Sequence, residues 1–310
     1  MKKVVFIFLF CALSIGVNFA QEDLTEEPQI HYVNPSAPRS FINLTMKEVD
    51  SGNIKVFYAL NATDIGDPET YDDLQCLEIG PQLSRYYSYY VYNSDSLVTD
   101  WKKKNPTVRD KMAPFQLGPK GKFKGWSEYL HSEYFKDFSK KELTEYARMP
   151  FGLEKLDARY SEPLPVLDWE VDDETQTVAG YLCQKATCKF RGREYTAWFS
   201  MDIPVSNGPW KLGGLPGLIL KAYDKDKLYS FECVGIEHHK QKFPIKENKA
   251  FERYMKTDRK KLWKNKKEIQ EDYFNISLAT TGTAALRFSD PGNPSSYEER
   301  QAPYNPLELE

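Results

Sequence analysis

The fold of this chain is decided by residues 167–236, which read LDWEVDDETQTVAGYLCQKATCKFRGREYTAWFSMDIPVSNGPWKLGGLPGLILKAYDKDKLYSFECVGI. Segments rich in β-branched and aromatic residues alternate here with polar loops, a pattern typical of strands. The predicted strands are Leu167–Val171, Thr175–Phe190, Glu194–Met201, Leu218–Tyr223 and Leu228–Ile236. The loops at 172–174, 191–193 and 224–227 are too short for the crossover that parallel strands need. We therefore expect an antiparallel sheet.

Outside this stretch, the sequence adds strands and a few helices. Further strands are predicted at Phe41–Met46, Ile54–Ala62, Leu74–Ile79 and Arg85–Tyr92, and helices at Asp95–Lys104 and Ala250–Tyr273. Residues 126–146 fit either a helix or a strand, and residues 105–125, rich in proline and glycine, read as an irregular loop. The last helix repeats apolar residues near helical spacing, so it can pack on a sheet. The expected fold class is α+β, mainly β: a curved antiparallel sheet with a C-terminal helix packed on it.

The first twenty residues have the layout of a secretory signal peptide. Lys2 and Lys3 form a basic start, residues 4–17 are almost entirely apolar or small, and Ala20 precedes an acidic stretch. The apolar run is short for a bilayer-spanning helix, which argues against the alternative of a retained anchor. Cys11 follows Phe10, whereas a lipoprotein signal has a small residue before its cysteine. We expect cleavage near Ala20 and a periplasmic or secreted protein that is not a lipoprotein.

The composition excludes two classes of protein. The formal net charge is −3, and removal of Lys2 and Lys3 takes it to −3 − 2 = −5. Proteins that bind nucleic acid draw much of their affinity from Lys and Arg, so we expect no nucleic-acid partner. The sequence also has no second long apolar run, so we do not expect a membrane-spanning protein.

Four cysteines remain after signal removal: Cys76, Cys183, Cys188 and Cys233. An even number in an oxidising envelope favours disulfides, with three possible connectivities. Cys183 and Cys188 would lie on opposite faces of one strand, about 16 Å apart, whereas bridged cysteines need Cα atoms within about 7 Å. We favour bridges between different strands, with four buried free thiols as the alternative.

The sequence offers no constellation of catalytic or metal-binding residues. It contains no G-x-S-x-G elbow, no H-E-x-x-H motif and no cysteine pair with metal-ligand spacing. The only histidines are His31, His131, His238 and His239, and the last two are expected in a solvated loop. We therefore predict no catalytic residue, no metal site and no cofactor.

One motif carries a resemblance to a known family. Residues 214–219 read GLPGLI, and the chain resembles the GLPGLI family of exported bacterial proteins. The resemblance extends to GYLCQKA at 180–186, to FRGR at 190–193, and to the closing PYNPLEL at 303–309. It implies a secreted or periplasmic protein of a Gram-negative-type envelope, in the company of outer-membrane TonB-dependent transport systems. The family has no established activity.

The predicted organisation follows from these segments. Residues 1–20 form the signal peptide and residues 21–50 a lead-in. Residues 51–310 form a single GLPGLI-type domain. Within it we expect a strand-rich core at 165–237, a helix at 250–273 and an extended tail at 280–310, docked in places by Tyr297 and Tyr304.

The GLPGLI motif also has a direct physical interpretation. Pro216 and Gly217 occupy the second and third positions of a predicted type II turn, in which Gly217 supplies the positive φ. Gly213 and Gly214 let the backbone pass close to a ring, either Trp198 or Trp210. The segment is then either a tight corner that feeds a core strand or the floor of a ligand groove.

The predicted binding residues surround this corner. Arg191 and Arg193 flank a turn glycine and can clamp a carboxylate or phosphate, the alternative being exposed turn charges. Trp198 and Trp210 can form an aromatic shelf, the alternative being core packing. The candidate ligand-binding set is Arg191, Arg193, Trp198, Trp210, Gly213, Gly214, Pro216 and Gly217.

These observations favour an exported, non-enzymatic binding or accessory protein of the bacterial cell envelope. It would hold a small apolar, peptidic or metal-chelate ligand and serve an outer-membrane transport system, with a TonB-dependent transporter or another envelope protein as its partner. The alternative is an assembly factor that docks an envelope partner through a sheet edge or through the basic face of the last helix. A hydrolase is the least favoured interpretation.

Overall fold

The structure is a computed structural model and describes residues 35–123, 125–281 and 306–310. These residues belong to one compact unit, Tyr32–Glu310. The predicted signal peptide, the start of the predicted lead-in and most of the predicted tail, with Tyr297 and Tyr304, lie outside the described residues.

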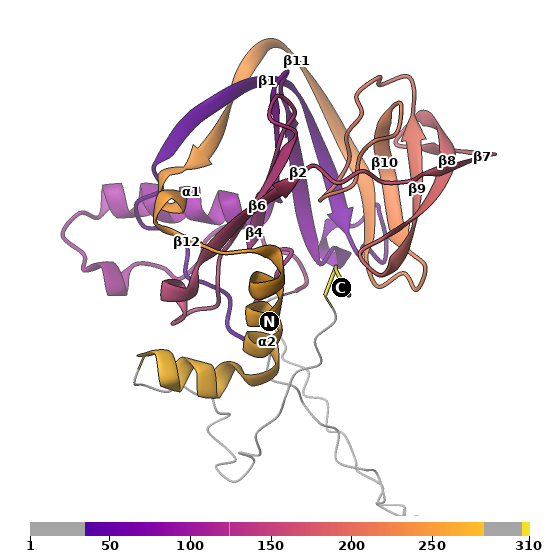
Figure 1. The fold of residues 1–310 in the computed structure, drawn as a ribbon. Helices are drawn as coiled ribbons and strands as arrows, with labels where there is room; N and C mark the ends of the chain where they lie inside the picture. Colours follow the sequence, from indigo (N-terminus) through magenta and orange to yellow (C-terminus); the bar gives the residue numbers. More distant parts are fainter. Residues whose placement is uncertain (1–34, 124, 282–305) are drawn as a thin grey trace, which may run out of the picture. The chain divides into compact units, whose positions relative to one another are not determined.

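Twelve strands of the described residues form one sheet in the order β12-β6-β5-β4-β3-β2-β1-β11-β10-β9-β8-β7 (Figure 1). The strands are β1 Met46–Leu60, β2 Asp73–Ile79, β3 Leu83–Ser88, β4 Ser132–Asp137, β5 Glu142–Ala147, β6 Ala158–Pro163, β7 Glu170–Val178, β8 Tyr181–Phe190, β9 Arg193–Ser200, β10 Leu218–Asp224, β11 Ser230–Asn248 and β12 Met255–Lys256. Every pairing is antiparallel except the short contact of β12 with β6. The predicted fold class, mainly β with an antiparallel sheet, is confirmed.

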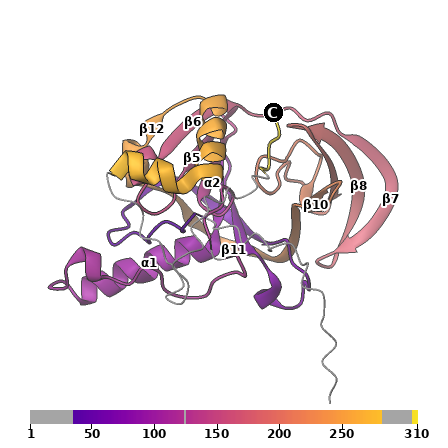
Figure 2. The same ribbon diagram turned by 90° about the horizontal axis from the view of Figure 1, so that it is seen from below.

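In the described part of the chain, two α-helices accompany the sheet, α1 Tyr89–Lys104 and α2 Arg259–Thr281. Short 3-10 turns lie at Pro68–Thr70, Asp110–Met112, Glu154–Leu156 and Lys249–Arg253. In Figure 2, both α-helices lie toward one end of the sheet, and β7 and β8 curve at the other. Among the described residues, no helix combines the length and the apolar composition that crossing a bilayer requires.

The longest strands, β1 and β11, form the middle of the sheet. Their pairing runs from Met46 opposite Asn248 to Leu60 opposite Phe231, with three register shifts along the way. An extra residue in one strand bends it and increases its twist. The shifts therefore account for the marked bend of both strands in Figure 1.

The described residues form three hydrophobic clusters, of which two position the parts discussed below. The larger one lies between the central strands and β8–β10, and its fully buried members include Tyr58, Phe199 and Trp210. In the second cluster, Leu262 and Ile269 of α2 pack against side chains from β5, β6 and the loops beside them. The predicted packing of a C-terminal helix on the sheet is thus confirmed.

The hairpin between β7 and β8 lies elsewhere than the sequence predicted. Its turn is Ala179–Gly180, where both residues have positive φ (50° and 85°), as a type I′ turn requires. The acidic residues 172–174, predicted as the turn, form a bulge between Val171 and Thr175. The acidic run has the polarity typical of a turn, but Ala179–Gly180 supplies the positive φ values that the turn requires.

The tyrosine-rich segment Arg85–Tyr92 is half strand and half helix, which corrects the prediction of a single strand. Strand β3 ends at Ser88, whose hydroxyl accepts a hydrogen bond from the Val91 N–H (3.1 Å) and so caps α1. The helix therefore begins at Tyr89, six residues before the predicted Asp95. A side-chain cap outweighs the strand propensity of the following tyrosines.

The predicted edge strand Phe41–Met46 is absent, and β1 begins only at Met46. Side chains of α1 take its backbone groups instead: the Phe41 N–H donates to Asp95 (2.8 Å) and the Leu44 N–H to Thr99 (2.9 Å). Residues 126–146, for which the sequence pattern fits either a helix or a strand, form β4 and most of β5.

Helix α2 begins at Arg259, nine residues after the predicted Ala250. Residues 249–256 instead form a 3-10 turn and β12, because the Met255 N–H donates to the Asp157 carbonyl beside β6 (2.9 Å). Asp258 then accepts a hydrogen bond from the Lys261 N–H (3.0 Å) and starts the helix. His238 and His239 lie within β11 and not in a loop.

Candidate functional site

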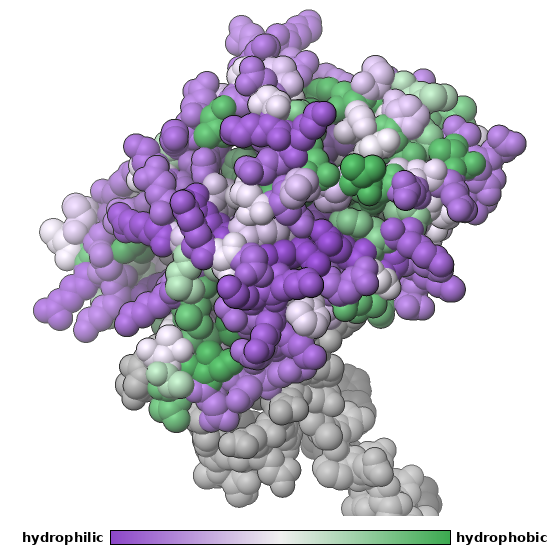
Figure 3. Space-filling view, viewed as in Figure 1, coloured by the Kyte–Doolittle hydropathy of each residue, from purple (hydrophilic) through white to green (hydrophobic). Residues whose placement is uncertain are grey.

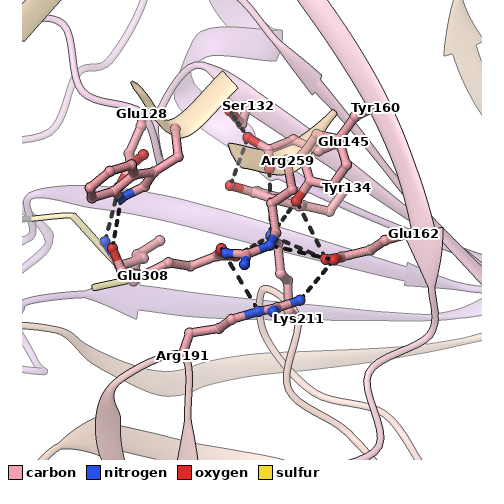
Figure 4. Close-up of polar contacts among 12 residues, drawn as sticks. Glu128, Ser132, Tyr134, Glu145, Tyr160, Glu162, Arg191, Lys211, Arg259 and Glu308 are labelled. Carbon is pink, nitrogen blue, oxygen red and sulfur yellow. Dashed lines mark hydrogen bonds and ion pairs between the residues drawn. The ribbon is translucent and has the colours of Figure 1, made fainter. Parts of the chain in front are cut away.

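The most prominent polar feature is a cluster of eight buried or half-buried charged side chains, hereafter the Lys211 cluster (Figure 4). It brings together β5, β6, the loop before β10, helix α2 and the C-terminal residues 306–310. Its members are Glu128, Glu145, Glu162, Arg191, Lys211, Arg259, Lys266 and Glu308. With four cations and four carboxylates, its formal charge is balanced.

Lys211 lies at the centre and is 3% exposed. Its Nζ forms an ion pair with Glu308, donates a hydrogen bond to the Tyr160 hydroxyl (2.5 Å), and lies 3.6 Å from carboxylate oxygens of both Glu145 and Glu162. An ammonium group removed from water needs such partners, because an unpaired buried charge costs several kcal/mol. Lys211 therefore ties the loop before β10 to β5, β6 and the C-terminus.

A second buried lysine, Lys266 of α2, anchors the helix to the same cluster. Its Nζ lies 2.5 Å from Glu145, which also accepts a hydrogen bond from Ser132 (2.9 Å). Burial alone would lower the pKa of Lys266, but the carboxylates of Glu145 and Glu128 raise it above its usual value. Burial would raise the pKa of Glu145, yet Lys266 and Lys211 lower it to about 2. Both groups are thus charged at neutral pH.

Glu145 and Lys266 are held in their charged forms. A general acid or base works best with a pKa near the working pH, whereas Glu145 and Lys266 are shifted away from neutrality. The hollow beside the cluster has room for about one water molecule. The arrangement holds the carboxylate of Glu308 against the cations of Lys211, Arg259 and Arg191.

The two predicted arginines both reach this region. Arg191 forms an ion pair with Glu162 (2.7 Å) at the edge of the cluster. Arg193 is buried, pairs with Asp224 (2.9 Å), and donates two hydrogen bonds to the Pro306 carbonyl. The alternative of two exposed turn charges is wrong for Arg193, because the curved sheet folds this turn against the C-terminal residues.

The two predicted tryptophans are part of the core. Trp198 is 5% exposed and Trp210 is 1% exposed, and both belong to the large hydrophobic cluster. Of the eight predicted binding residues, only Trp210 borders the hollow at the Lys211 cluster. Arg191 and Arg193 thus both contact the C-terminal residues beside the cluster, and Trp210 lines its hollow, whereas Trp198 does not.

The glycine-rich corner is tight, but its geometry differs from the prediction. The positive φ belongs to Gly214 (90°) and not to Gly217, so the predicted type II turn through Pro216 and Gly217 is wrong. Gly217 is required for another reason: a Cβ there would lie 2.1 Å from the Ser200 carbonyl oxygen. The neighbouring ring is Trp169, whose Nε1 donates to the Gly213 carbonyl (2.8 Å).

A buried lysine that sequence reasoning missed holds this corner in place. The Nζ of Lys136, on β4, lies within hydrogen-bond distance of Asn207 Oδ1 (2.9 Å) and the carbonyls of Gly208 (3.1 Å) and Leu212 (2.6 Å). Three acceptors match the three donors of an ammonium group. The corner is therefore fixed to the far half of the sheet.

The four cysteines are free thiols and all are buried. This is the arrangement named as the alternative to interstrand bridges. Burial raises the pKa of the Cys183 thiol to about 11 and that of Cys76, Cys188 and Cys233 to about 12. Because the thiolate is the reactive form, these thiols are unreactive in the folded protein. Within the described residues, no group of His, Cys, Asp or Glu is arranged to hold a metal ion.

Most of the Lys211 cluster was not foreseen, although one signal was available. Lys266 lies four residues after Leu262 and three before Ile269, on the buried face of α2, within a run of exposed lysines. A charge on the apolar face of a helix requires a buried partner. Lys266 does not stand out in the sequence because other lysines surround it. The acidic residues of the cluster on β5, β6 and the C-terminal segment come close to it only in the folded chain.

Comparison with known proteins gives a family match over one segment. Residues 190–221 match the model of a family described as "Protein of unknown function (Porph_ging)". The matched segment contains Arg191, Lys211 and the glycine-rich corner. No curated protein matches the chain.

Comparison with solved structures gives distant similarities. The chain is similar to two structures of PNGF-II, one in space group P21 and one in space group C2, with 13% and 14% identity. The similarity covers 69% and 71% of this chain, with TM-scores of 0.42 and 0.43. The chain spans about a third of the length of those proteins, 33% and 34%.

Proposed function

We propose that this protein is an exported, non-enzymatic accessory protein of the bacterial cell envelope that docks a partner through the edge strand β7. The observation that carries the proposal is the edge itself. Within the described residues, β7 is the last strand of the sheet and pairs with β8 alone. A strand with one unpaired side can accept a strand from another protein.

The register shows which residues present this edge. The two-residue turn Ala179–Gly180 makes Val178 and Tyr181 the first hydrogen-bonded pair, and the pairs then alternate along the hairpin. Thr177 and Thr175 therefore direct their backbone N–H and C=O groups away from β8. Their side chains are exposed, so a partner strand can approach without displacing part of the core.

The charge of the edge favours a basic partner. Four acidic residues lie along β7: Glu170, Asp172, Asp173 and Glu174. Of these four, Glu174 alone forms an ion pair with another described residue, Lys185 of β8 (2.5 Å). Like charges would repel a second copy of β7, whereas an extended segment rich in Lys or Arg would be attracted.

The family resemblance supports the setting of this proposal. The GLPGLI letters at 214–219 fall within the segment that matches the family model. We propose that the chain is a GLPGLI-type protein that functions in the periplasm or outside the cell. Its partner would be an outer-membrane TonB-dependent transporter or another envelope protein. A carrier of small ligands is less well supported, because Trp198 and Trp210 are buried in the core.

A single substitution tests the edge. Thr177→Pro removes an outward N–H but leaves the hydrogen bonds with β8 intact, and proline is tolerated on edge strands. Thr177→Ala is the matched control, since it keeps the N–H. After crosslinking in the native envelope, the tagged wild type and the alanine variant should recover a common partner that the proline variant loses. Equal recovery with the proline variant would exclude docking through β7.

A further inference from the structure

The C-terminal residues Pro306–Glu310 are bound to the rest of the chain as an extended peptide is bound by a receptor. Their backbone is recognised along its length. Arg193 donates a hydrogen bond to the Pro306 carbonyl. At Leu307, the N–H donates to Glu128 (2.9 Å) and the carbonyl accepts from Tyr195 (3.2 Å). Trp263 donates to the Glu308 carbonyl (3.0 Å), and the Leu309 N–H donates to the Arg191 carbonyl (2.9 Å).

Pro306, Leu307 and Glu308 of this segment are buried. Leu307 is 2% exposed and belongs to the large hydrophobic cluster. Glu308 is 7% exposed, and its carboxylate contacts Lys211, Arg259 (2.7 Å) and Arg191 (3.8 Å). The next residue, Leu309, is 49% exposed. The site therefore selects a leucine followed by a glutamate and places little demand on the residue after them.

The charges around the segment favour an acidic ligand. Without Glu308, the Lys211 cluster keeps four cations (Lys211, Lys266, Arg259 and Arg191) against three carboxylates (Glu128, Glu145 and Glu162). An uncompensated buried cation is costly, so the vacated site would attract a carboxylate. Leu307 would leave an apolar hollow beside Trp210 and Leu262, which favours an aliphatic side chain next to that carboxylate.

We propose that this groove is a peptide-binding site for an extended Pro-Leu-Glu segment of a partner protein, and that the C-terminal residues of the chain are its resident, competing occupant. The contacts involve the backbone of this segment and the side chains of Leu307 and Glu308, and Pro306 beside them is buried as well. The covalent connection to the chain is not part of the recognition. This site is separate from the β7 edge, and neither proposal depends on the other.

The test uses the full-length chain and a labelled peptide, NPLELE, that copies residues 305–310. In a chain carrying Leu307→Ala and Glu308→Gln, the resident segment is weakened and the peptide should bind saturably. The wild-type chain should bind the same peptide at least 10-fold more weakly, because its own segment competes. A peptide with glutamine at the position of Glu308 should lose at least 10-fold in affinity, whereas one with alanine at the position of Leu309 should change less than 3-fold.

Failure of the double variant to bind the peptide, while it remains folded by circular dichroism, would overturn the proposal. So would equal binding of the glutamate and glutamine peptides. If the double variant does not fold, hydrogen exchange on the wild-type chain replaces it. Excess NPLELE should then accelerate exchange at residues 307–310 and leave β8 unchanged. An unchanged rate at 307–310 would mean that the segment is only a structural strap.

Discussion

Lys211 shows at the scale of one residue how a buried charge organises its surroundings. We expect Lys211→Met to destabilise the protein by about 3–5 kcal/mol, because it leaves Glu308, Glu145 and Glu162 with one cation fewer in a buried site. Lys225→Met is the control, since Lys225 is exposed and its pairing with Glu194 (3.2 Å) is screened by water. That change should cost less than about 1 kcal/mol. Urea unfolding of the two variants measures the difference, and equal losses would mean that the cluster is not the main contribution of Lys211.

His131 gives a prediction about pH at the same scale. It is 6% exposed, and burial together with the Arg148 guanidinium lowers its pKa to about 3. Below about pH 6.5 the unfolded chain therefore binds a proton that the folded chain does not. Stability should fall as the pH decreases from 6.5 toward 3, by up to about 1.4 kcal/mol per pH unit from this residue.

The measurement is the free energy of unfolding of wild type and His131→Gln at several pH values between 4 and 7. The variant should show a shallower loss toward acid. His238→Gln is the control, because His238 lies exposed on β11, and it should keep the wild-type slope. Parallel curves for wild type and His131→Gln would contradict the proposed role of the histidine.

The sequence was least informative about which individual residues form the candidate site. Arg191 and Arg193 were identified because glycine marks their turn, and turn chemistry is local. Glu145, Glu162 and Glu308 were missed because their significance depends on a lysine and an arginine that are distant in the sequence. A charge becomes part of a buried cluster only when several elements pack together.

At the scale of the element, the glycine-rich corner contains one glycine whose Cβ would clash with a neighbouring strand and one whose Cβ would not. A Cβ at Gly217 would meet the Ser200 carbonyl oxygen at 2.1 Å, and a backbone atom of β9 cannot move aside cheaply. We expect Gly217→Ala to destabilise the protein by about 3 kcal/mol. Gly213→Ala is the matched control, because its nearest neighbours lie 3.8 Å away and its φ is ordinary.

Thermal unfolding of these two alanine variants provides the comparison. The Gly213 variant should stay within about 1 kcal/mol of wild type, since alanine also restricts the unfolded chain. A milder effect at position 217 than at position 213 would show that the corner is not held against β9 as the structure describes.

Elements with a local signal were predicted well, and those set by distant contacts were not. The turns at 191–192 and 224–227 carry glycine or charge next to β-rich segments, and both were found. The starts of α1 and α2 were displaced by six and nine residues. Helix α1 begins early because Ser88 caps it at the end of β3, so the helix includes tyrosines predicted as strand. Helix α2 begins late because β12 pairs with β6 through residues predicted as helix.

At the scale of the whole unit, one continuous sheet links all four cysteines. Cys76 lies on β2, Cys183 and Cys188 on β8, and Cys233 on β11. The four thiols are therefore distributed over both halves of the sheet. The class of fold was predictable because strand patterns recur along the chain. The strand order was not, because it depends on β1 and β11 pairing across almost two hundred residues of sequence.

Thiol reactivity therefore tests the structure as a whole. In native buffer none of the four cysteines should react with a thiol reagent, because each is buried and burial raises its pKa. In urea all four should become reactive over one transition, since opening any of these strands disrupts the same sheet. The mass of the unreduced, denatured protein supplies the second readout: each disulfide would lower it by two hydrogen atoms, and the free-thiol structure predicts no such loss. A mass lower by four hydrogens would establish two disulfides and contradict the free-thiol structure. Early reaction of Cys183 and Cys188 alone would show that the β7–β8 edge opens independently of the central strands.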